Sequence, residues 1–485
     1  MHVLMEEVPT GHTPESLAAL ERPGRGLMLL RTGTFDVPEA RYSFVVARPM
    51  LRFRSWGTAC ETRDDQGRRE AQFGNPWQHV ALLLERYELP DVPDAPFPLG
   101  GCFGYWGYDL KQFVEPRVTR RAVNDLELPD CDLGFHPSLV VFDHQLGRTW
   151  VVATGLDAAG NRSERSARRQ LDFWRQRLRT PPTDPDPVRS SCIHPAAMSL
   201  ASSLPRTAFL QAVERALQYI RAGDIYQVNL AHRLGVSCPI TGWAFFLRLA
   251  ARSPAPFAAF LDCGRFQVAS SSPELFLRIS GRHIITRPIK GTRPRHSDPV
   301  RDAQLSWELQ RSEKENAELV MITDLLRNDL GRVCEFGSIR VPDLARLERF
   351  AQVQHLVSTV EGRLAPGVTH LDALAACFPG GSITGAPKVR AMEIIDALEP
   401  VARGPYCGCH GYLGFNHESQ FSITIRTALV FQRQAWFHVG AGIVADSNPV
   451  AEYEETLAKA GGFLAALEAA GAPSGRPAAL PGSRP

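Results

Sequence analysis

The sequence predicts an α/β protein, of the α+β type, in which helices accompany antiparallel strands. Its first half holds short β-branched or aromatic segments that are bounded by turn residues and interrupted by helical patterns. Its second half alternates longer helical patterns with strands. Short turns join neighbouring strands there, as at 279–283, which favours antiparallel pairing. With 485 residues the chain could form one large domain or roughly two to four conventional ones.

Hydrophobic periodicity predicts the individual elements in order. In the first half we expect strands at 42–47, 139–142 and 149–152 and helices at 77–87 and 163–178. In the second half we expect an amphipathic helix at 206–222 and strands at 268–269, 275–279, 283–286, 420–431 and 435–439.

Prolines mark the expected division of the chain. Four of them fall between 181 and 187, which excludes regular structure and indicates a surface connection. The end of the chain is rich in Pro, Gly, Ala and Ser, and we expect it to fray. We therefore predict an N-terminal half at 1–180, a connection at 181–205, a C-terminal region at 206–470 and a flexible tail at 471–485.

Composition and charge exclude several classes of protein. Lys and Arg number 54 and Asp and Glu 52, so a formal charge of +2 argues against nucleic acid as a partner. The ten cysteines are scattered as in reduced proteins, and Cys407 and Cys409 are too close together for a zinc knuckle. No stretch approaches the ~18 apolar residues of a membrane helix, and the N-terminus lacks the apolar core of an export signal. We expect a soluble, cytoplasmic protein that does not bind membranes.

Two helical stretches carry pairs of glutamates. Glu315 and Glu318 lie three residues apart, so both project from one face of a helix. Ser312 could instead form a capping box with Glu315, leaving the rest solvated.

The second stretch begins at 447–449 with good helix-starting residues. Glu452, Glu455 and Lys459 form a stripe about 60° wide beside an apolar face. That face consists of Tyr453, Leu457, Ala460, Leu464 and Leu467. Two glutamate pairs on different helices could bind one Mg²⁺ directly or through water, or could form solvated acidic faces.

Lys290 lies between Pro288 and Gly291, directly after a predicted strand. It could be a solvated lysine in a surface turn. It could also be a nucleophilic amine, which requires a pKa lowered by burial or by cations such as Arg287 and Arg293.

Glycines mark two further places. The stretch 380–388 precedes a helical pattern at 389–398 but lacks the spacing of a P-loop. It is either a tight turn or a helix start that offers backbone N–H groups to a carboxylate. Gly440 and Gly442 would permit close backbone approach to a ligand.

Together these stretches resemble the chorismate-utilising family, which includes anthranilate synthase component I, aminodeoxychorismate synthase component I, and the isochorismate and salicylate synthases. The resemblance is dense over about 200–468. The stretches that carry it are GDIYQVNLAHR, SSSPELF, PIKGTRPR, KENAELVMITDLLRNDLGRV, VQHLVSTVEG, FPGGSITGAPKVRAMEIID, ITIRTALV, GAGIVADS and EYEET. It implies one large α/β unit of two packed halves around a β-sandwich of antiparallel sheets, with a chorismate-binding catalytic region at 206–470.

Two positions distinguish the members of that family. Gln227 stands where the water-adding members have a lysine base, which argues against water attack. Lys290 makes the stretch read PIKGT, as in the aminodeoxychorismate synthases, whereas anthranilate synthases read PIAGT. The resemblance therefore implies amination of chorismate at C4, towards 4-aminobenzoate and folate. Anthranilate synthase component I is the alternative, and a non-catalytic homologue that senses tryptophan or chorismate is a third.

The resemblance also assigns roles to residues. Glu274 would be the general acid and Lys290 a nucleophile that forms a covalent intermediate. Mg²⁺ would be the cofactor, bound by Glu318 and Glu455 with Glu315 and Glu452 nearby. The expected substrate-binding residues are Thr292, His355, Thr384, Gly385, Tyr406, Arg426, Gly440, Gly442 and Lys459.

Two further expectations follow from the family. We find no glutaminase segment with a nucleophilic cysteine, so a separate glutamine amidotransferase subunit would supply the ammonia. Related proteins bind tryptophan in the first half. The corresponding residues here are Arg41, Tyr42, Ser43, Phe44, Pro256, Phe257 and Ala258. The nearby stretch 29–32 departs from the usual serine-containing pattern, which argues against tryptophan binding.

Overall fold

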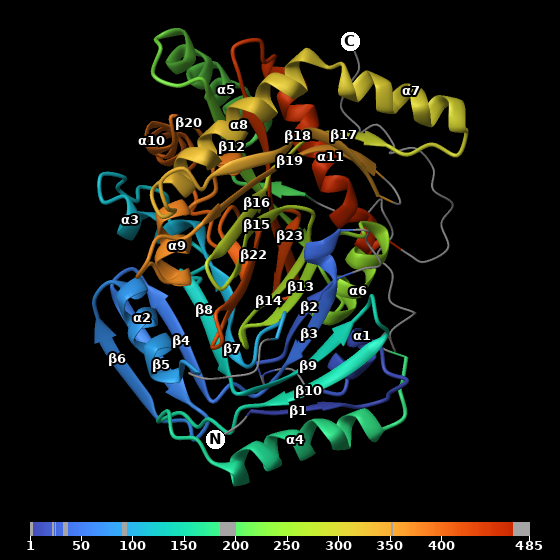
Figure 1. The fold of residues 1–485 in the computed structure, drawn as a ribbon. Helices are drawn as coiled ribbons and strands as arrows, with labels where there is room; N and C mark the ends of the chain where they lie inside the picture. Colours follow the sequence, from blue (N-terminus) through green and yellow to red (C-terminus); the bar gives the residue numbers. More distant parts are fainter. Residues whose placement is uncertain are drawn as a thin grey trace.

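The structure is a computed structural model and describes residues 3–21, 24, 26–32, 37–89, 95–184, 200–350 and 353–468. Two large antiparallel sheets form the body of the molecule, and helices surround them (Figure 1). The predicted fold class is therefore confirmed. The predicted tail at 471–485 and the part of the predicted connection at 185–199 lie outside the described residues.

The first sheet contains strands from both halves of the chain. Its order is β1 (Leu4–Glu7), β10 (Arg148–Ala153), β9 (Ser138–Asp143), β3 (Tyr42–Val46), β2 (Met28–Arg31), β13 (Phe257–Asp262), β14 (Gln267–Ser272), β23 (Thr427–Phe431), β24 (Gln434–Ile443), β12 (Gln227–Ser237) and β11 (Ala201–Ser202), with β20 (Gly385–Ala386) paired to β12. The two halves meet where β2 pairs with β13.

The second sheet is shared in the same way. Its order is β17 (Ile289–Pro294), β19 (Val353–Arg363), β16 (His283–Arg287), β15 (Leu275–Ser280), β22 (Glu418–Ile423), β21 (Cys409–Gly414), β7 (Gly101–Trp106), β8 (Cys131–His136), β4 (Leu51–Trp56), β5 (Ala59–Asp64) and β6 (Arg69–Phe73), with β18 (Arg340–Arg349) paired to β19. Here the halves meet where β21 pairs with β7.

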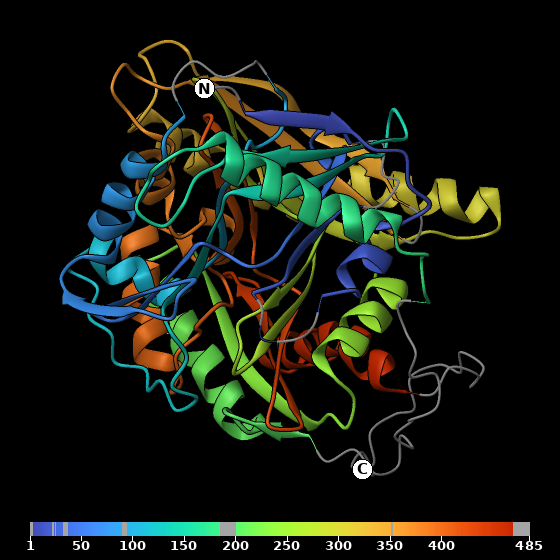
Figure 2. The ribbon, with the colours of Figure 1, turned by 90° about the horizontal axis from the view of Figure 1, so that it is seen from below.

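The helices lie around these sheets (Figures 1 and 2). They are α1 (Pro14–Ala18), α2 (Pro76–Tyr87), α3 (Lys111–Val114), α4 (Glu164–Arg179), α5 (Arg206–Arg221), α6 (Gly242–Arg252), α7 (Pro299–Gln310), α8 (Glu313–Gly331), α9 (His370–Cys377), α10 (Lys388–Leu398) and α11 (Pro449–Leu467), with short 3₁₀ turns η1 (Pro38–Ala40), η2 (Tyr108–Leu110) and η4 (Gly381–Ile383). Helix α4 packs on β9 and β10, whereas α8 packs on β17, β18 and β19. Within the described ranges no helix combines the length and apolar character needed to cross a membrane.

One predicted strand is wrong. The stretch 420–431 is not continuous, because β22 ends at Ile423 in the second sheet and β23 begins at Thr427 in the first. Arg426 lies in this connection with a left-handed φ of 48°. The chain leaves one sheet for the other here, so the residues between must turn even though their side chains suit a strand.

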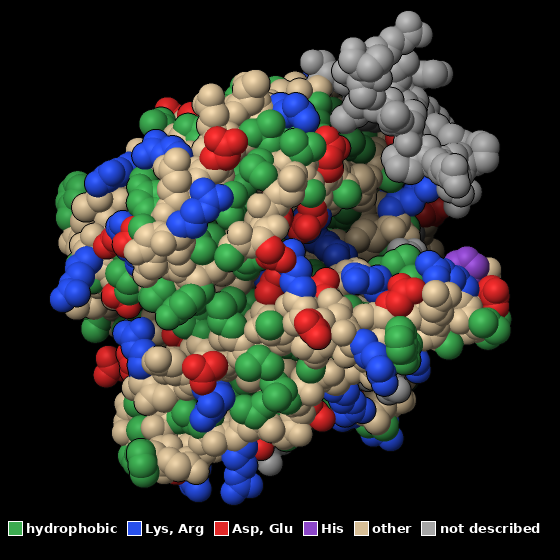
Figure 3. All heavy atoms as spheres, turned by 90° about the horizontal axis from the view of Figure 1, so that it is seen from above, with side chains coloured by type: hydrophobic (Ala, Val, Ile, Leu, Met, Phe, Trp, Pro, Cys, Tyr) green, Lys and Arg blue, Asp and Glu red, His purple; other side chains and the backbone are tan. Residues whose placement is uncertain are grey.

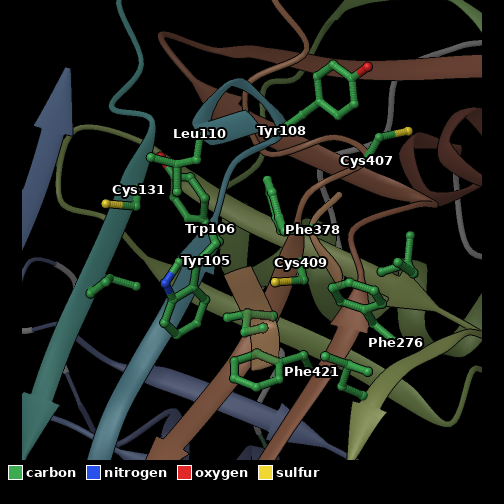
Figure 4. Packing of buried hydrophobic residues seen from close by; sticks show 14 of the residues in the cluster. Tyr105, Trp106, Tyr108, Leu110, Cys131, Phe276, Phe378, Cys407, Cys409 and Phe421 are labelled. Carbon is green, nitrogen blue, oxygen red and sulfur yellow. The ribbon is translucent and has the colours of Figure 1, made fainter. Parts of the chain in front are cut away.

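Aromatic side chains fill the core between the sheets. Phe44 of the first sheet packs edge-on against Tyr412 of the second, with ring centroids 5.2 Å apart. Trp106 and Phe421 make a T-shaped pair at 5.3 Å (Figure 4). Such pairs contribute roughly 0.5–1.5 kcal/mol beyond their buried area. Cys407 and Cys409 are free, buried thiols in this core.

Candidate active site

The two acidic helices bring their carboxylates into one region of the molecule. The Ser312 hydroxyl accepts from the Glu315 N–H at 3.4 Å and caps α8, and Asn448 caps α11. Glu318 experiences the negative charge of both Glu315 and Glu455, so carboxylates of the two helices interact. Figure 3, which views this side from above, shows acidic and basic side chains around a hollow in the surface.

The predicted apolar face of α11 is partly wrong. Thr456 and Ala460 are buried on that helix, and so is Glu452, which is only 6% exposed. Glu455 and Lys459 remain exposed. The buried face of α11 is therefore rotated towards Glu452. Of the two glutamates on this helix, Glu452 is buried and Glu455 is exposed.

Each of the four glutamates has a partner from the chain. The contacts are Glu318 to Lys290 at 3.8 Å, Glu315 to Arg293 at 3.6 Å, Glu455 to Lys459 at 2.7 Å, and Glu452 accepting from the Ser447 hydroxyl at 2.6 Å. Among the described residues no three Asp, Glu, His or Cys side chains gather closely enough to hold a metal ion.

Electrostatics nevertheless make this region suitable for a cation. Burial raises the pKa of Glu318, and the neighbouring Glu315 and Glu455 raise it further. Burial likewise raises the pKa of Glu452. A divalent cation with oxygen ligands would relieve this repulsion. The residues therefore fit a Mg²⁺ site. Two protein carboxylates would bind the ion, and its other coordination positions would be open to substrate or water.

Lys290 lies in a strand and not in the surface turn that one interpretation of the sequence favoured. It belongs to β17 and is paired with Leu356 of β19. Its side chain is 18% exposed. Arg287 is engaged by Glu39 and Glu348, and Arg293 lies against Glu315.

Glu274 follows β14 and is buried. Burial raises the pKa of its carboxyl to about 7, although a hydrogen bond from Ser382, the charge of Lys290 and the backbone of Ile289 all act in the opposite direction. Near neutral pH about half of such groups carry a proton, which is the state a general acid requires.

His355 of β19 pairs with Thr292 of β17 in the same ladder. Its Nδ1 lies 2.9 Å from the Thr292 hydroxyl and 3.2 Å from the Gly291 carbonyl. Burial lowers the pKa of His355 to about 4, so the ring is neutral at pH 7. Because a carbonyl only accepts, the Gly291 contact assigns the proton to Nδ1. The buried Nε2, which has no hydrogen-bond partner in the described ranges, is left as an acceptor.

Arg426 is a cation with no ionic partner among the residues that the structure describes. Its side chain is partly buried, and the structure gives its guanidinium no ion pair or hydrogen bond within the described residues. Burial lowers the pKa of Arg426, and its positive charge reaches His355. A desolvated cation is costly unless an anion offsets it. The position therefore suits a substrate carboxylate.

The loop before α10 is joined closely to β12. Gly385 has a φ of 145°, and a Cβ there would lie 2.1 Å from the Gln227 carbonyl oxygen. The Thr384 hydroxyl donates to the Gly380 carbonyl at 3.0 Å, and the Thr384 carbonyl accepts from the Asn229 N–H at 2.8 Å. Only glycine fits position 385, and the backbone is thereby held against the strand.

Two glycines of β24, the ladder neighbour of β12, allow other predicted site residues to approach closely. A Cβ on Gly440 would lie 2.9 Å from the Tyr406 hydroxyl, and one on Gly442 would lie 2.6 Å from Nε2 of Gln227. Lys459 donates to the Gly440 carbonyl at 2.8 Å. The structure therefore brings Tyr406, Gly440 and Lys459 together, as well as Gly385, Gln227 and Gly442.

Comparison with known proteins decides the family. Residues 37–465 match the family described as chorismate binding enzyme. The chain belongs to this family.

Relatives with different names resemble this chorismate binding enzyme. It is 46% identical over 399 residues to anthranilate synthase component 1 of Thermus thermophilus, covering 81% of this chain and 82% of the relative. It is 37% identical over 442 residues to aminodeoxychorismate synthase component 1 of Escherichia coli, covering 91% and 93%. Its fold is similar to the crystal structure of anthranilate synthase component I from Streptococcus pneumoniae, with a TM-score of 0.77 and 30% identity over 90% of this chain and 94% of that one.

The residues that the family resemblance predicts at a tryptophan pocket are closely packed in the structure. Tyr42, Phe44, Phe257 and Ala258 help to line a cavity of about 20 Å³, which is room for about one water molecule.

Polar residues of the same region bind one another. Ser43 exchanges hydrogen bonds with the backbone of Thr32, whose hydroxyl donates to the Pro256 carbonyl at 2.9 Å. Arg41 donates to both oxygens of Asp143.

Sequence reasoning missed two contributors to the site. Ser382, which hydrogen-bonds Glu274, lies two residues before Thr384 in a stretch whose glycines and backbone N–H groups give no signal for a role of its side chain. Arg403 lies three residues before Tyr406 and is fully buried in an ion pair with Glu399. A signal for Arg403 exists in the sequence, because a cation beside Gly404 and Cys407 in an otherwise apolar stretch needs a buried partner.

Proposed function

We propose that this chorismate binding enzyme is the chorismate-aminating component of an aminodeoxychorismate synthase, which converts chorismate and ammonia to 4-amino-4-deoxychorismate. The position of Lys290 carries the proposal. Its amine is mostly buried, lies 3.8 Å from Glu318, and is close enough to Glu274 to lower the pKa of that carboxyl. This position between the proposed general acid and a proposed metal ligand supports a nucleophilic role for the lysine. The relative from E. coli that bears this name supports the assignment.

The chemistry assigns a task to each of these groups. Chorismate has two carboxylates and an allylic hydroxyl, which is a poor leaving group. Glu274 donates a proton to the C4 hydroxyl, which departs as water while the Nζ of Lys290 adds at C2 through its lone pair, which must be free of a proton at that step. Ammonia then adds at C4, and the bond between C2 and Lys290 breaks. The balance is one chorismate and one ammonia consumed, with one aminodeoxychorismate and one water formed.

Mg²⁺ would be held by Glu318 and Glu455, with Glu315 and Glu452 acting through water. When bound, the ion would neutralise the ring carboxylate and withdraw electron density from the ring. In the structure these side chains are paired with Lys290, Lys459, Arg293 and Ser447, so they would exchange those partners for the ion.

The remaining residues would bind and orient the substrate. Arg426 offers an unpaired cation to one carboxylate. The other carboxylate would lie beside Tyr406, Lys459, Gly440, Gly442, Thr384 and Gly385, some of which contact one another. His355, held by Thr292, would accept a hydrogen bond at Nε2.

Ammonia would come from a separate glutamine amidotransferase subunit. The relatives are named as component 1 of their synthases, which implies a second component. The purified chain should then use ammonium at alkaline pH by itself, but glutamine only when the amidotransferase is added.

Anthranilate synthase component I is the second candidate, because the relative from T. thermophilus has 46% identity and that name. The two candidates differ in the carbon that receives the amino group. Incubation with chorismate, Mg²⁺ and ammonium, followed by product identification by mass and NMR, separates C4 from C2 amination.

The matched test replaces Lys290 by alanine and uses Lys314→Ala as its control. Lys314 is exposed, and its charge also reaches Glu318, but it has no proposed chemical role. We expect Lys290→Ala to lose the 4-amino product and to gain some 2-amino product, while Lys314→Ala retains C4 amination. Wild-type enzyme should also give an adduct whose mass maps to the peptide containing Lys290. Unchanged C4 amination by Lys290→Ala would rule out covalent catalysis.

A further inference from the structure

A buried ion pair between Arg403 and Glu399 contacts several segments of the candidate site. Arg403 donates from Nε and Nη2 to the two oxygens of Glu399, at 2.8 and 2.6 Å. The side chains are 1% and 4% exposed. Charges so completely removed from water are stable only when their hydrogen bonds are satisfied, so the remaining contacts of the pair identify what it supports.

Those contacts reach two separate segments of the site. Nη1 of Arg403 donates to the Ile383 carbonyl at 3.2 Å, and Nη2 donates to the Asn229 carbonyl at 2.7 Å. Glu399 accepts from the Ala231 N–H at 2.8 Å. Ile383 directly precedes Thr384 and Gly385. The pair therefore connects the loop before α10 to β12.

The same ion pair also lies close to β24 and to Tyr406. Asn229 and Ala231 stand opposite Gly442 and Gly440 in the ladder between β12 and β24. The Arg403 guanidinium also lies 5.6 Å from the ring centroid of Tyr406 and 4.7 Å from that of Tyr108. Tyr108 lies at this end of the core, near Cys407 (Figure 4).

We propose that Arg403, held by Glu399, is a positioning residue that fixes the loop before α10, β12 and Tyr406 at the spacing needed to bind one carboxylate of the substrate. The proposal rests on the proposed function only in taking chorismate as the ligand. It concerns binding and is independent of which ring carbon is aminated.

Arginine is required here for a geometric reason. Its planar guanidinium has five donors in fixed directions, and here it serves a carboxylate and two carbonyls at once. Lysine keeps the charge, but a single ammonium cannot span these acceptors with the same geometry. Arg403→Lys should therefore keep a positive charge beside Glu399 but lose the donors to the Ile383 and Asn229 carbonyls, so that the loop is held against β12 less firmly, by its remaining hydrogen bonds from Asn229.

The test compares Arg403→Lys with Arg52→Lys in the N-terminal half. Arg52 also donates to both oxygens of a buried carboxylate, Asp132, and to one carbonyl, that of Asp262. Both variants should lower the melting temperature. Only Arg403→Lys should raise the KM for chorismate, by about tenfold or more, with kcat within about threefold of wild type, because binding to a carboxylate is the same in ground and transition states. Consumption of chorismate is the readout, so the result does not depend on product identity.

A second measurement requires no turnover. Chorismate with Mg²⁺ should raise the melting temperature of wild type and of Arg52→Lys, and Arg403→Lys should need a higher chorismate concentration for the same rise. If Arg403→Lys does not fold, Glu399→Gln is measured in the same way, since its amide oxygen can still accept from Ala231. The proposal is overturned if KM is unchanged in Arg403→Lys or rises equally in Arg52→Lys. It is also overturned if neither Arg403→Lys nor Glu399→Gln folds while Arg52→Lys does. The ion pair would then be purely structural.

Discussion

Two arginines of the N-terminal half and Arg426 of the candidate site differ in how their charges are paired. In the N-terminal half Arg41 and Arg52 each bind both oxygens of an aspartate, Asp143 and Asp132. In the candidate site Arg426 has no acceptor among the described residues. Buried charges that are fully paired support the fold, whereas those left unpaired or repelling one another cost stability and are prepared for a ligand.

The largest expected effect is on turnover, when one of the mutually repelling glutamates of the candidate site is replaced. Glu318→Gln or Glu455→Gln should lower turnover by roughly 10²–10³-fold, because an ion that stabilises developing charge contributes several kcal/mol. Protein stability should stay the same or rise, since Glu318 is repelled by Glu315 and Glu455. Asp143→Asn in the paired region should instead lower the melting temperature and spare turnover. Full activity of a chelated, metal-free preparation would contradict the metal role.

The next effect concerns the pH dependence of stability. Burial raises the pKa of Glu274 from 4.5 to about 7, so between these values the native state binds more protons than the unfolded state. The stability of wild type should therefore fall as pH rises through this window, by up to about 3 kcal/mol. Glu274→Gln has no proton to lose and should be more stable than wild type at pH 8, and nearly equal to it below pH 4.5, although inactive.

Unfolding by urea at pH 5 and pH 8 measures this difference. Asp143→Asn is the control, because hydrogen bonds from Arg41 and the backbone outweigh burial and lower the pKa of Asp143 from 3.8. Its loss of stability should be the same at both pH values. If the difference in free energy of unfolding between Glu274→Gln and wild type is also the same at pH 5 and pH 8, the Glu274 carboxyl does not titrate in this window.

A smaller effect is expected from the unpaired cation. Arg426→Met should raise the KM for chorismate by roughly 10–100-fold, since hydrogen bonds to charged groups contribute about 1.5–3 kcal/mol. It should not destabilise the protein, because no described partner is lost. Arg41→Met should do the reverse, with a lower melting temperature and an unchanged KM. Steady-state kinetics and thermal unfolding of both variants test this, and destabilisation by Arg426→Met would show that its charge is already paired.

The smallest effect is expected in the N-terminal half. L-Tryptophan at about 1 mM should change the melting temperature of wild type by less than about 1 °C, because the cavity beside Tyr42 holds about one water molecule. Tyr42→Ala enlarges that cavity. A tryptophan-dependent rise only in Tyr42→Ala would show that the side chain is the obstacle, whereas a rise of several degrees in wild type would contradict this account.

Elements with strong local signals could be predicted from the sequence. The predicted helix at 206–222 corresponds to α5, and the helix start at 447–449 corresponds to the cap and first residue of α11. Both rest on periodicity and capping, which are properties of neighbouring residues. The presence of a glutamate pair on each of α8 and α11 is predictable for the same reason.

Features that depend on distant parts of the chain could not be predicted. The stretch around Arg426 has the β-branched and apolar residues of a strand on both sides, and only the change of sheet forces the turn there. Pro288 and Gly291 suggest a turn, but β19 supplies the partner that makes Lys290 part of a strand. The interaction of Glu318 with Glu455 depends on how two helices pack. The hydrogen bond from Ser382 to Glu274 depends on the folded loop.

The sharing of both sheets has a consequence for how the polypeptide is made. Met28 pairs with Leu261 and Gly101 with Gly414, so one partner strand of β2 and one of β7 are synthesised much later than β2 and β7 themselves. Until then each offers an open edge of unpaired N–H and C=O groups, which favours aggregation. A topology with so many distant pairings folds slowly. The newly made first half therefore depends on chaperones, or on low temperature during expression, more than its apolar content alone would suggest.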